Sequence, residues 1–273
     1  MATGIAIAIG LNAVDPAHYG GWSGNLIACE FDANDMAAIA KAQGFTVSTL
    51  LTRAATRQAV LSHISDAAQK LQSGDILMLS YSGHGGQLPD LNSDESDRRD
   101  ETWCLFDGEL VDDELYGSFS QFAAGVRILV FSDSCHSGTV TRDAYYASMR
   151  RGLGGTARDR CLPRELVMTV YHANQSFYDP ILKNRAIAER LEAIKASVLL
   201  ISGCQDNQTS ADGDFNGLFT GVLKEVWNAG KFKSGYRYFH RSIQRRMPPY
   251  QTPNYMMIGA PNRTFEHQKP FTV

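Results

Sequence analysis

Two kinds of hydrophobic pattern alternate along most of the chain. Apolar and β-branched runs predict strands at residues 4–11, 45–51, 75–81, 102–106, 126–132, 197–202 and 254–258. Apolar residues at helical spacing predict helices at residues 32–43, 56–71, 111–122, 218–228 and 236–245. Buried strands that alternate with helices are typical of an α/β fold. We therefore expect a mostly parallel sheet of about six strands, with helices on both faces.

Composition narrows the class of protein. No apolar run approaches the ~20 residues that a membrane-spanning helix needs, and a net charge of −3 argues against a general nucleic-acid binder. The five cysteines include no C-x-x-C pair, which indicates a reducing compartment. We therefore expect a cytoplasmic protein with no membrane or nucleic-acid partner. Residues 1–135 carry a net charge of −11 and residues 136–273 carry +8.

The length of 273 residues fits a single domain over residues 1–273. One stretch, residues 137–180, breaks the alternation of strands and helices and is rich in Arg, Gly and Tyr. It is far longer than an ordinary loop of a compact domain. The stretch is therefore functional, or mobile, or contains elements that the pattern does not reveal.

Candidate chemistry follows two of the predicted strands. Strand 75–81 runs into SGHGG at 82–86, and strand 126–132 runs into DSCHSG at 133–138. If these parallel strands are neighbours, His84 and Cys135 project into one crevice at their carboxyl ends. An imidazole that takes the proton of a thiol is the basis of cysteine nucleophile catalysis. The glycines beside His84 leave backbone N–H groups free to bind an oxyanion.

Other interpretations of these two residues remain open. A cysteine at a strand end is often a small buried hydrophobe, and a histidine is often a buried polar group with its hydrogen bonds satisfied. A zinc site is disfavoured, because Cys135 and His136 are adjacent and structural zinc motifs separate their ligands by at least two residues.

The segments SYSGHGGQ and FSDSCHSG resemble the histidine and cysteine signatures of caspase-like peptidases of the metacaspase and orthocaspase branch. Further similar segments are NLIACEFDANDM, DETWCLFD, LVDDEL and SGCQDNQTSADG. The resemblance covers residues 3–140 and 196–260. It implies a caspase-like three-layer sandwich with a p20-like part at 1–140, an Arg-rich linker at 141–195 and a p10-like part at 196–273.

The resemblance also implies roles for individual residues. His84 is the expected general base and Cys135 the nucleophile, and the amides of Gly85 and Cys135 are the expected oxyanion donors. The specificity pocket for the residue before the cut (S1) is expected to contain Asp32, Ser82 and Asp133. Two carboxylates in a partly dry pocket favour Arg or Lys and repel an acidic side chain. An alternative interpretation of Asp32 is a helix N-cap.

Calcium-activated metacaspases resemble the acidic region that follows. The implied metal ligands are Asp97, Asp112 and Asp113, although Arg142 stands near the place of a further carboxylate of the family. No cofactor is expected for the chemistry itself, and calcium is expected only as an activator. The alternative is that Asp112 and Asp113 charge a helix N-terminus.

The long basic stretch offers sites at which an enzyme that cuts after Arg could cleave itself. The candidates are Arg142, Arg150, Arg151, Arg158, Arg160 and Arg164. The alternative is an ordinary basic surface loop. In the loop after strand 197–202, Asp206 is a candidate for the pocket rim.

The sequence therefore predicts a monomeric cysteine endopeptidase that cuts peptides after Arg or Lys. Its expected partners are protein or peptide substrates and an activating protease or regulator. Two other functions stay open: a non-peptidase hydrolase or acyltransferase with the same dyad, and a catalytically silent adaptor.

Overall fold

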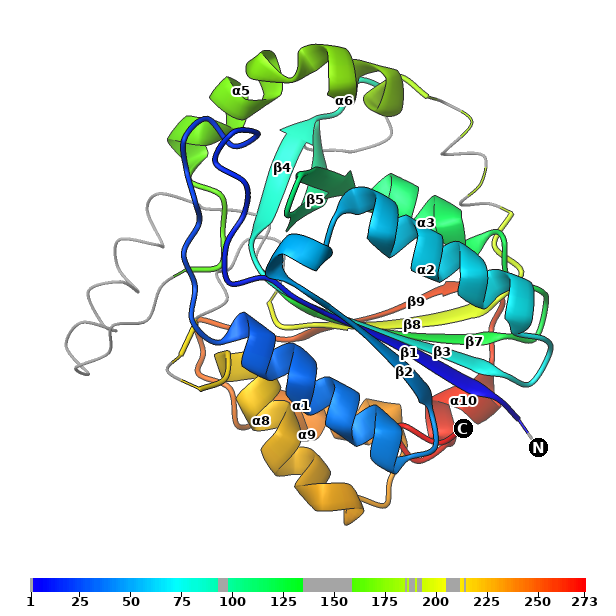
Figure 1. The fold of residues 1–273 in the computed structure, drawn as a ribbon. Helices are drawn as coiled ribbons and strands as arrows, with labels where there is room; N and C mark the ends of the chain where they lie inside the picture. Colours follow the sequence, from blue (N-terminus) through cyan, green and yellow to red (C-terminus); the bar gives the residue numbers. More distant parts are fainter. Residues whose placement is uncertain are drawn as a thin grey trace.

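The computed structural model describes residues 2–92, 98–134, 159–184, 186, 190, 193–204, 212–213 and 215–273. Its main sheet has six strands in the order β2-β1-β3-β7-β8-β9 (Figure 1). Their bounds are Thr46–Leu51, Gly4–Gly10, Ile76–Ser82, Arg127–Asp133, Ser197–Ser202 and Asn254–Gly259 in that order. Five strands run parallel, and β9 is antiparallel to β8. The expected mostly parallel sheet is confirmed.

Helices cover both faces of this sheet (Figure 1). One face carries α2 (Arg57–Lys70) and α3 (Asp112–Phe119), and the other carries α1 (Cys29–Ala42), α8 (Leu218–Trp227) and α9 (Tyr236–Gln244). A short helix, α10 (Arg263–His267), and two 3₁₀ turns at Thr52–Ala54 and Asn228–Gly230 complete this part of the chain. Each face has its own apolar core, because the inner strands are buried on both sides.

A second, three-stranded antiparallel sheet lies beside the main one. It contains β4 (Gly85–Pro89), β5 (Arg99–Leu105) and β6 (Gly108–Val111). The sequence pattern predicted only β5. It missed β4 because GGQLP contains none of the β-branched or aromatic residues typical of strands. The helix expected at 111–122 is shorter, because β6 takes up residue 111 and α3 ends at Phe119.

The stretch 137–180 that broke the sequence pattern contains helix α5 (Arg164–Ala173) and most of helix α6 (Gln175–Leu182). They cover the small sheet at the top of Figure 1. Apolar residues of both helices are buried against it in two further clusters. The pattern did not reveal them because α5 follows Leu162-Pro163 without a polar N-cap side chain and α6 contains Pro180.

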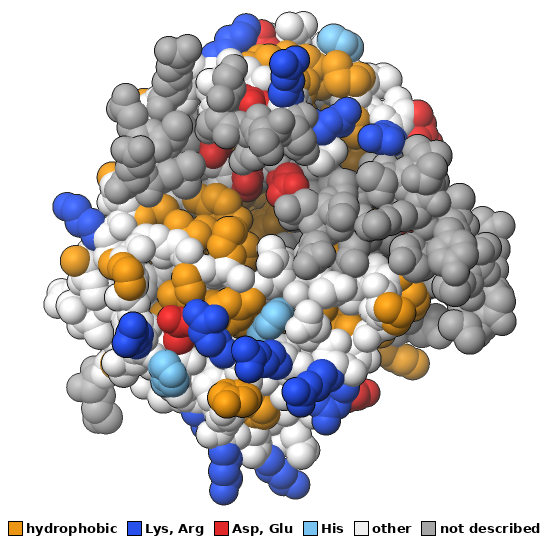
Figure 2. All heavy atoms as spheres, turned by 180° about the vertical axis from the view of Figure 1, so that it is seen from behind, with side chains coloured by type: hydrophobic (Ala, Val, Ile, Leu, Met, Phe, Trp, Pro, Cys, Tyr) orange, Lys and Arg blue, Asp and Glu red, His pale blue; other side chains and the backbone are white. Residues whose placement is uncertain are grey.

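The edge of the main sheet that β9 forms is partly open to solvent. Every residue of β9 is at least partly exposed, whereas the inner strand β8 is buried throughout. Figure 2 shows the molecule from behind, with hydrophobic side chains gathered in the middle of that face and Lys and Arg side chains below them. Among the described residues, no helix is long and apolar enough to cross a membrane.

Candidate active site

The carboxyl ends of β3 and β7 lie side by side. The two strands pair in parallel, with Ser82 opposite Asp133, so the expectation that they are neighbours is confirmed. His84 lies two residues after the end of β3, and Ser134 directly follows β7. The predicted nucleophile Cys135 lies outside the described residues. His84, the other member of the predicted dyad, lies within them.

The imidazole of His84 is held in one orientation. It is 4% exposed, and its Nε2 lies 2.8 Å from the carbonyl oxygen of Gly24. The ring also packs on Trp22, with ring centroids 4.6 Å apart. Because a carbonyl can only accept, Nε2 carries the hydrogen and Nδ1 is left as the proton acceptor. Burial, the largest cause, lowers the pKa of His84 to about 4, so the ring is neutral at ordinary pH.

Gly24 is a functional position that the sequence analysis missed. Its φ is +54°, and a Cβ built on it would lie 3.0 Å from Cδ2 of His84. Only glycine adopts this backbone conformation at little cost while it leaves room for the ring. A glycine whose carbonyl orients a side chain 60 residues away has no motif in the sequence, so no local pattern could have identified it.

The backbone of Gly85 binds the chain's own residues 160–162. Its N–H donates to the carbonyl oxygen of Arg160 at 3.0 Å, and its carbonyl accepts from the N–H of Leu162 at 2.8 Å. Gly85 and Cys161 form an isolated parallel bridge. The amide of Cys135, the other predicted oxyanion donor, is outside the described residues. The Gly85 amide thus polarises the carbonyl of the Arg160–Cys161 peptide bond.

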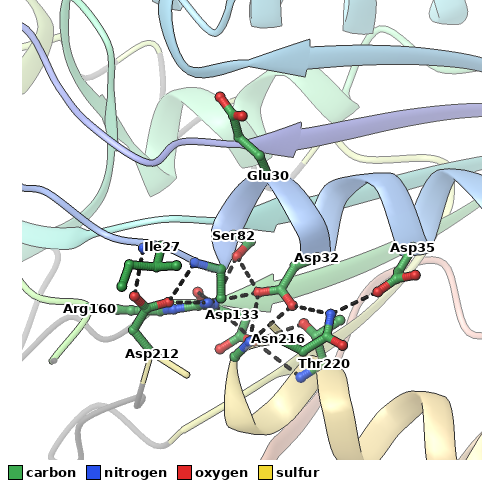
Figure 3. Close-up of polar contacts among 12 residues, drawn as sticks. Ile27, Glu30, Asp32, Asp35, Ser82, Asp133, Arg160, Asp212, Asn216 and Thr220 are labelled. Carbon is green, nitrogen blue, oxygen red and sulfur yellow. Dashed lines mark hydrogen bonds and ion pairs between the residues drawn. The ribbon is translucent and has the colours of Figure 1, made fainter. Parts of the chain in front are cut away.

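The side chain of Arg160 fills an acidic pocket (Figure 3). It is 0% exposed. Its Nη2 donates to Oδ2 of Asp32 at 2.8 Å and to Oδ1 of Asp212 at 2.9 Å. Its Nη1 donates to Oγ of Ser82 at 2.8 Å and lies 3.0 Å from Oδ2 of Asp133. The structure therefore brings together the three predicted pocket residues around a guanidinium.

Asp212 is the second functional residue that the sequence analysis missed. Its Oδ1 accepts from Arg160, and its Oδ2 accepts from the N–H of Ile27 at 2.8 Å. It belongs to the loop after β8, in which Asp206 was the candidate for the pocket rim. Asp206 lies outside the described residues. The available signal was the run of acidic residues in that loop, but the sequence alone does not say which of them turns inward.

Neighbouring groups hold the two predicted carboxylates in place. Oδ1 of Asp32 accepts from Nδ2 of Asn216 at 2.9 Å and from the N–H of Gly217 at 3.0 Å. Oδ2 of Asp133 accepts from Oγ1 of Thr220 at 2.8 Å. The alternative interpretation of Asp32 as an N-cap is wrong. Helix α1 begins three residues earlier at Cys29, so the Asp32 carboxylate lies one turn inside the helix and faces the pocket.

The charges of the pocket depend on each other. Burial raises the pKa of Asp32, and the Arg160 guanidinium opposes that shift. Burial alone would lower the pKa of Arg160, but Asp133, Asp32 and Asp212 raise it well above its usual value. Three carboxylates therefore face a single cation. Such a pocket is complementary to a guanidinium and strongly unfavourable for an anion.

The predicted metal ligands are not assembled within the described residues. Asp97 lies outside them, and across the described ranges no group of three His, Cys, Asp or Glu side chains is placed to hold a metal ion. Asp112 and Asp113 occupy the first turn of α3. Burial, followed by Glu101, Asp113 and Asp100, raises the pKa of Asp112. A bound cation would reduce the repulsion between these acidic groups. The described residues, however, do not supply a complete set of metal ligands.

The six arginines predicted as self-cleavage sites lie in different places. Arg142, Arg150, Arg151 and Arg158 lie outside the described residues. Arg164 is the first residue of α5. Of the six candidate cleavage residues, Arg160 is the one that the described part of the chain places in the pocket. The side chains of Cys29, Cys104 and Cys204 are buried.

A mostly parallel sheet with helices on both faces, a histidine after one central strand and an acidic pocket at the end of the next define a caspase-like α/β protein. The chain belongs to the caspase domain family, whose model matches residues 3–269. The metacaspase branch is supported by Metacaspase-1 of Schizosaccharomyces pombe, 33% identical over 62% of this chain, and Metacaspase-1 of Kluyveromyces lactis, 32% identical over 63%. The chain spans 44% of the length of each of these relatives.

Two solved structures are similar to the chain over most of its length. A crystal structure of a protein from Geobacter sulfurreducens is 58% identical and covers 99% of both chains, with a TM-score of 0.89. Caspase-1 of Spodoptera frugiperda is 14% identical and covers 94% of this chain and 86% of its own, with a TM-score of 0.56. The second likeness supports the fold, and the expected caspase-like sandwich is confirmed.

Proposed function

We propose that the chain is a cysteine endopeptidase that cleaves peptide bonds after arginine. Cys135 is the nucleophile and His84 the general base. The observation that carries this proposal is the binding of Arg160. Its guanidinium contacts three carboxylates, and its carbonyl oxygen accepts a hydrogen bond from the amide of Gly85. This is the arrangement that a substrate needs if the bond after its arginine is to be attacked.

The state of His84 supports its role as a base. With Nε2 bonded to Gly24, Nδ1 accepts the proton of the Cys135 thiol. The thiolate attacks the carbonyl carbon, and the amides of Gly85 and Cys135 stabilise the oxyanion that forms. The imidazolium then protonates the leaving amine. Water finally hydrolyses the thioester, with the neutral imidazole again as base. A ring with a pKa of about 4 is ready to accept a proton at neutral pH.

The geometry of the pocket favours arginine over lysine. Nη2 of Arg160 contacts Asp32 and Asp212, whereas Nη1 contacts Ser82 and Asp133. A guanidinium satisfies both sides at once because its two terminal nitrogens diverge. A lysine has one nitrogen, which reaches one side and leaves a carboxylate on the other side without its cation. We expect cleavage after Lys to be slower for this reason.

The chain also processes itself, and the bond after Arg160 is the one that the proposal selects. Until this bond is cut, Arg160 occupies the pocket that a substrate arginine needs, so the intact chain is latent toward other proteins. After cleavage, the segment that ends in the new carboxyl terminus at Arg160 can leave the pocket. Calcium, an expectation from the family resemblance, remains a proposal for how this step is triggered, and titration of calcium against a chelator tests it.

A panel of fluorogenic peptides ending in Arg, Lys or Asp tests the proposed function. The wild-type enzyme and Cys135→Ala are compared, each with and without calcium. We expect hydrolysis in the order Arg, then Lys, with none after Asp, and none by Cys135→Ala. Preference for Asp over Arg, or equal activity of the Cys135→Ala variant, would contradict the proposal.

A further inference from the structure

The chain that follows the Arg160–Cys161 bond is firmly attached to the rest of the protein. The side chain of Leu162 is 2% exposed and packs in an apolar cluster. Its partners there are Val14, Tyr19, Cys104, Val167 and Val170. The N–H of Leu162 donates to the carbonyl of Gly85. None of these contacts involves Arg160 and none passes through the Arg160–Cys161 bond, so cutting that bond leaves them in place.

The two helices that follow add further attachments. The hydroxyl of Tyr178, a fully buried residue, accepts from the N–H of Glu109 at 3.0 Å and lies 2.6 Å from Nε2 of His18. Nδ2 of Asn174 donates to the carbonyl of His18 at 3.0 Å. The ring of Phe177 lies under the guanidinium of Arg57 at 5.2 Å. Residues 161–182 therefore stay bound to the rest of the protein without the Arg160–Cys161 bond.

This retention has a chemical consequence if the proposed function holds. Cleavage turns the nitrogen of Cys161 into an α-amino group, which remains beside Gly85 because Leu162 is anchored next to it. Gly85, the residue after His84, forms an isolated parallel bridge with Cys161, so the new amino group stays next to the histidine. An ordinary protease loses the amine product to solvent. Here the amine stays at the site where the next acyl group arrives.

We propose that the processed enzyme is also an acyltransferase whose acceptor is its own α-amino group at Cys161. This activity rests on the proposed function, because the acyl group comes from an arginine substrate held as a thioester. The nitrogen of Cys161 attacks the thioester carbonyl, the carbon–sulfur bond breaks, and a carbon–nitrogen bond forms. His84 takes a proton from the attacking amine and returns it to the leaving thiolate.

The held amine competes well with water. Measured effective molarities of well-oriented groups reach ~10⁵ M or more, far above the concentration of bulk water. An α-amino group has an ordinary pKa of about 7.7–8.0, so a useful fraction is uncharged at neutral pH. The same step with Arg160 as the acyl group rejoins the chain. Self-cleavage is therefore reversible until the segment that ends in Arg160 leaves the pocket.

Intact-mass analysis of the processed enzyme tests this proposal. The donor is an acetylated peptide ending in an arginine aminomethylcoumarin amide, which does not react with amines unaided. We expect the fragment that begins at Cys161 to gain the mass of the donor acyl group in acid-quenched samples. Because the new Arg–Cys bond is itself cleavable, this adduct rises while donor remains and disappears after its exhaustion.

Two variants make the test specific. In Leu162→Ala the anchor of the amine is weakened, and we expect the ratio of adduct to released coumarin to fall about tenfold while hydrolysis continues. In Cys161→Ala the thiol is gone but the α-amino group remains, and we expect the adduct to persist. Loss of the adduct in Cys161→Ala would overturn the assignment of the amine as acceptor.

The possible failures are distinguishable. Release of coumarin with no adduct at any time would overturn the acyl transfer and leave the proposed hydrolysis intact. Dissociation of the fragment that begins at Cys161 during native gel filtration would overturn the retention on which it depends. Absence of both coumarin release and adduct would instead contradict the proposed function itself.

Discussion

The two sides of the Arg160–Cys161 bond are held by different kinds of contact. Before the bond, the described contacts are ionic and polar and come from α1, the ends of β3 and β7, and the loop after β8. After the bond, an apolar side chain and two helices are buried against the small sheet. Under the proposed function, a substrate arginine takes over the first set of contacts, whereas nothing in a substrate replaces the second. The chain before the bond is therefore the exchangeable part, and the chain after it is held permanently.

We expect the largest effect from removal of one of the carboxylates that contact the arginine side chain in the pocket. Loss of one partner from a buried ion pair costs about 3–5 kcal/mol. We therefore expect Asp32→Ala to lower kcat/KM for arginine peptides by about 150- to 5000-fold. Glu30→Gln is the matched control, because Glu30 lies on the same helix and points away from the pocket (Figure 3). Equal losses in both variants would contradict a specific role of Asp32.

Truncation of Leu162 should weaken the apolar contacts that hold the chain after the Arg160–Cys161 bond. Buried Leu→Ala substitutions cost about 2–5 kcal/mol, and we expect a loss in this range in the free energy of unfolding. The measurement is denaturant unfolding in the uncut Cys135→Ala background. Leu166→Ala, at a position on α5 that packs against the same cluster but is only partly buried, should cost less. A cost for Leu162→Ala no larger than that for Leu166→Ala would show that Leu162 is not an anchor.

A change at Gly24 should affect the imidazole of His84, the proposed general base, and leave the contacts on both sides of the Arg160–Cys161 bond unchanged. Alanine at φ +54° is strained, and its Cβ would press on His84. Backbone strain of this kind costs about 1–3 kcal/mol. We expect Gly24→Ala to lower kcat about 10- to 100-fold with little change in KM. Gly44→Ala, which carries a positive φ but no neighbour within 4 Å, controls for strain alone.

A substitution at Asp212 measures how much one carboxylate charge contributes to binding of the guanidinium. Asn in its place keeps an acceptor for the N–H groups of Ile27 and Ala28 but removes one charge from the guanidinium. We expect Asp212→Asn to lower kcat/KM for arginine substrates about tenfold, which is ~1.4 kcal/mol, and to affect lysine substrates less. An unchanged ratio of Arg to Lys cleavage would remove Asp212 from the determinants of specificity.

The sequence predicted what depends on local pattern. The buried strands, the helices and the ends of β3 and β7 followed from apolar runs, and Asp32, Ser82 and Asp133 followed from the family resemblance. It did not predict Gly24 and Asp212, whose contacts with His84 and Ile27 join segments 60 and 185 residues apart. Asp32 was open to misinterpretation because the start of α1 is not marked by a capping side chain. Arg160 was one of six equivalent arginines until the fold placed it.

The identity of the cut bond is the most direct test of the whole account. Intact mass and amino-terminal sequencing of the processed wild-type chain, beside uncut Cys135→Ala, measure it. We predict a fragment that begins at Cys161 in the wild type and a single chain in the variant. Fragments cut after other arginines, with the Arg160–Cys161 bond intact, would contradict the claim that Arg160 lies in the pocket as the enzyme's own substrate.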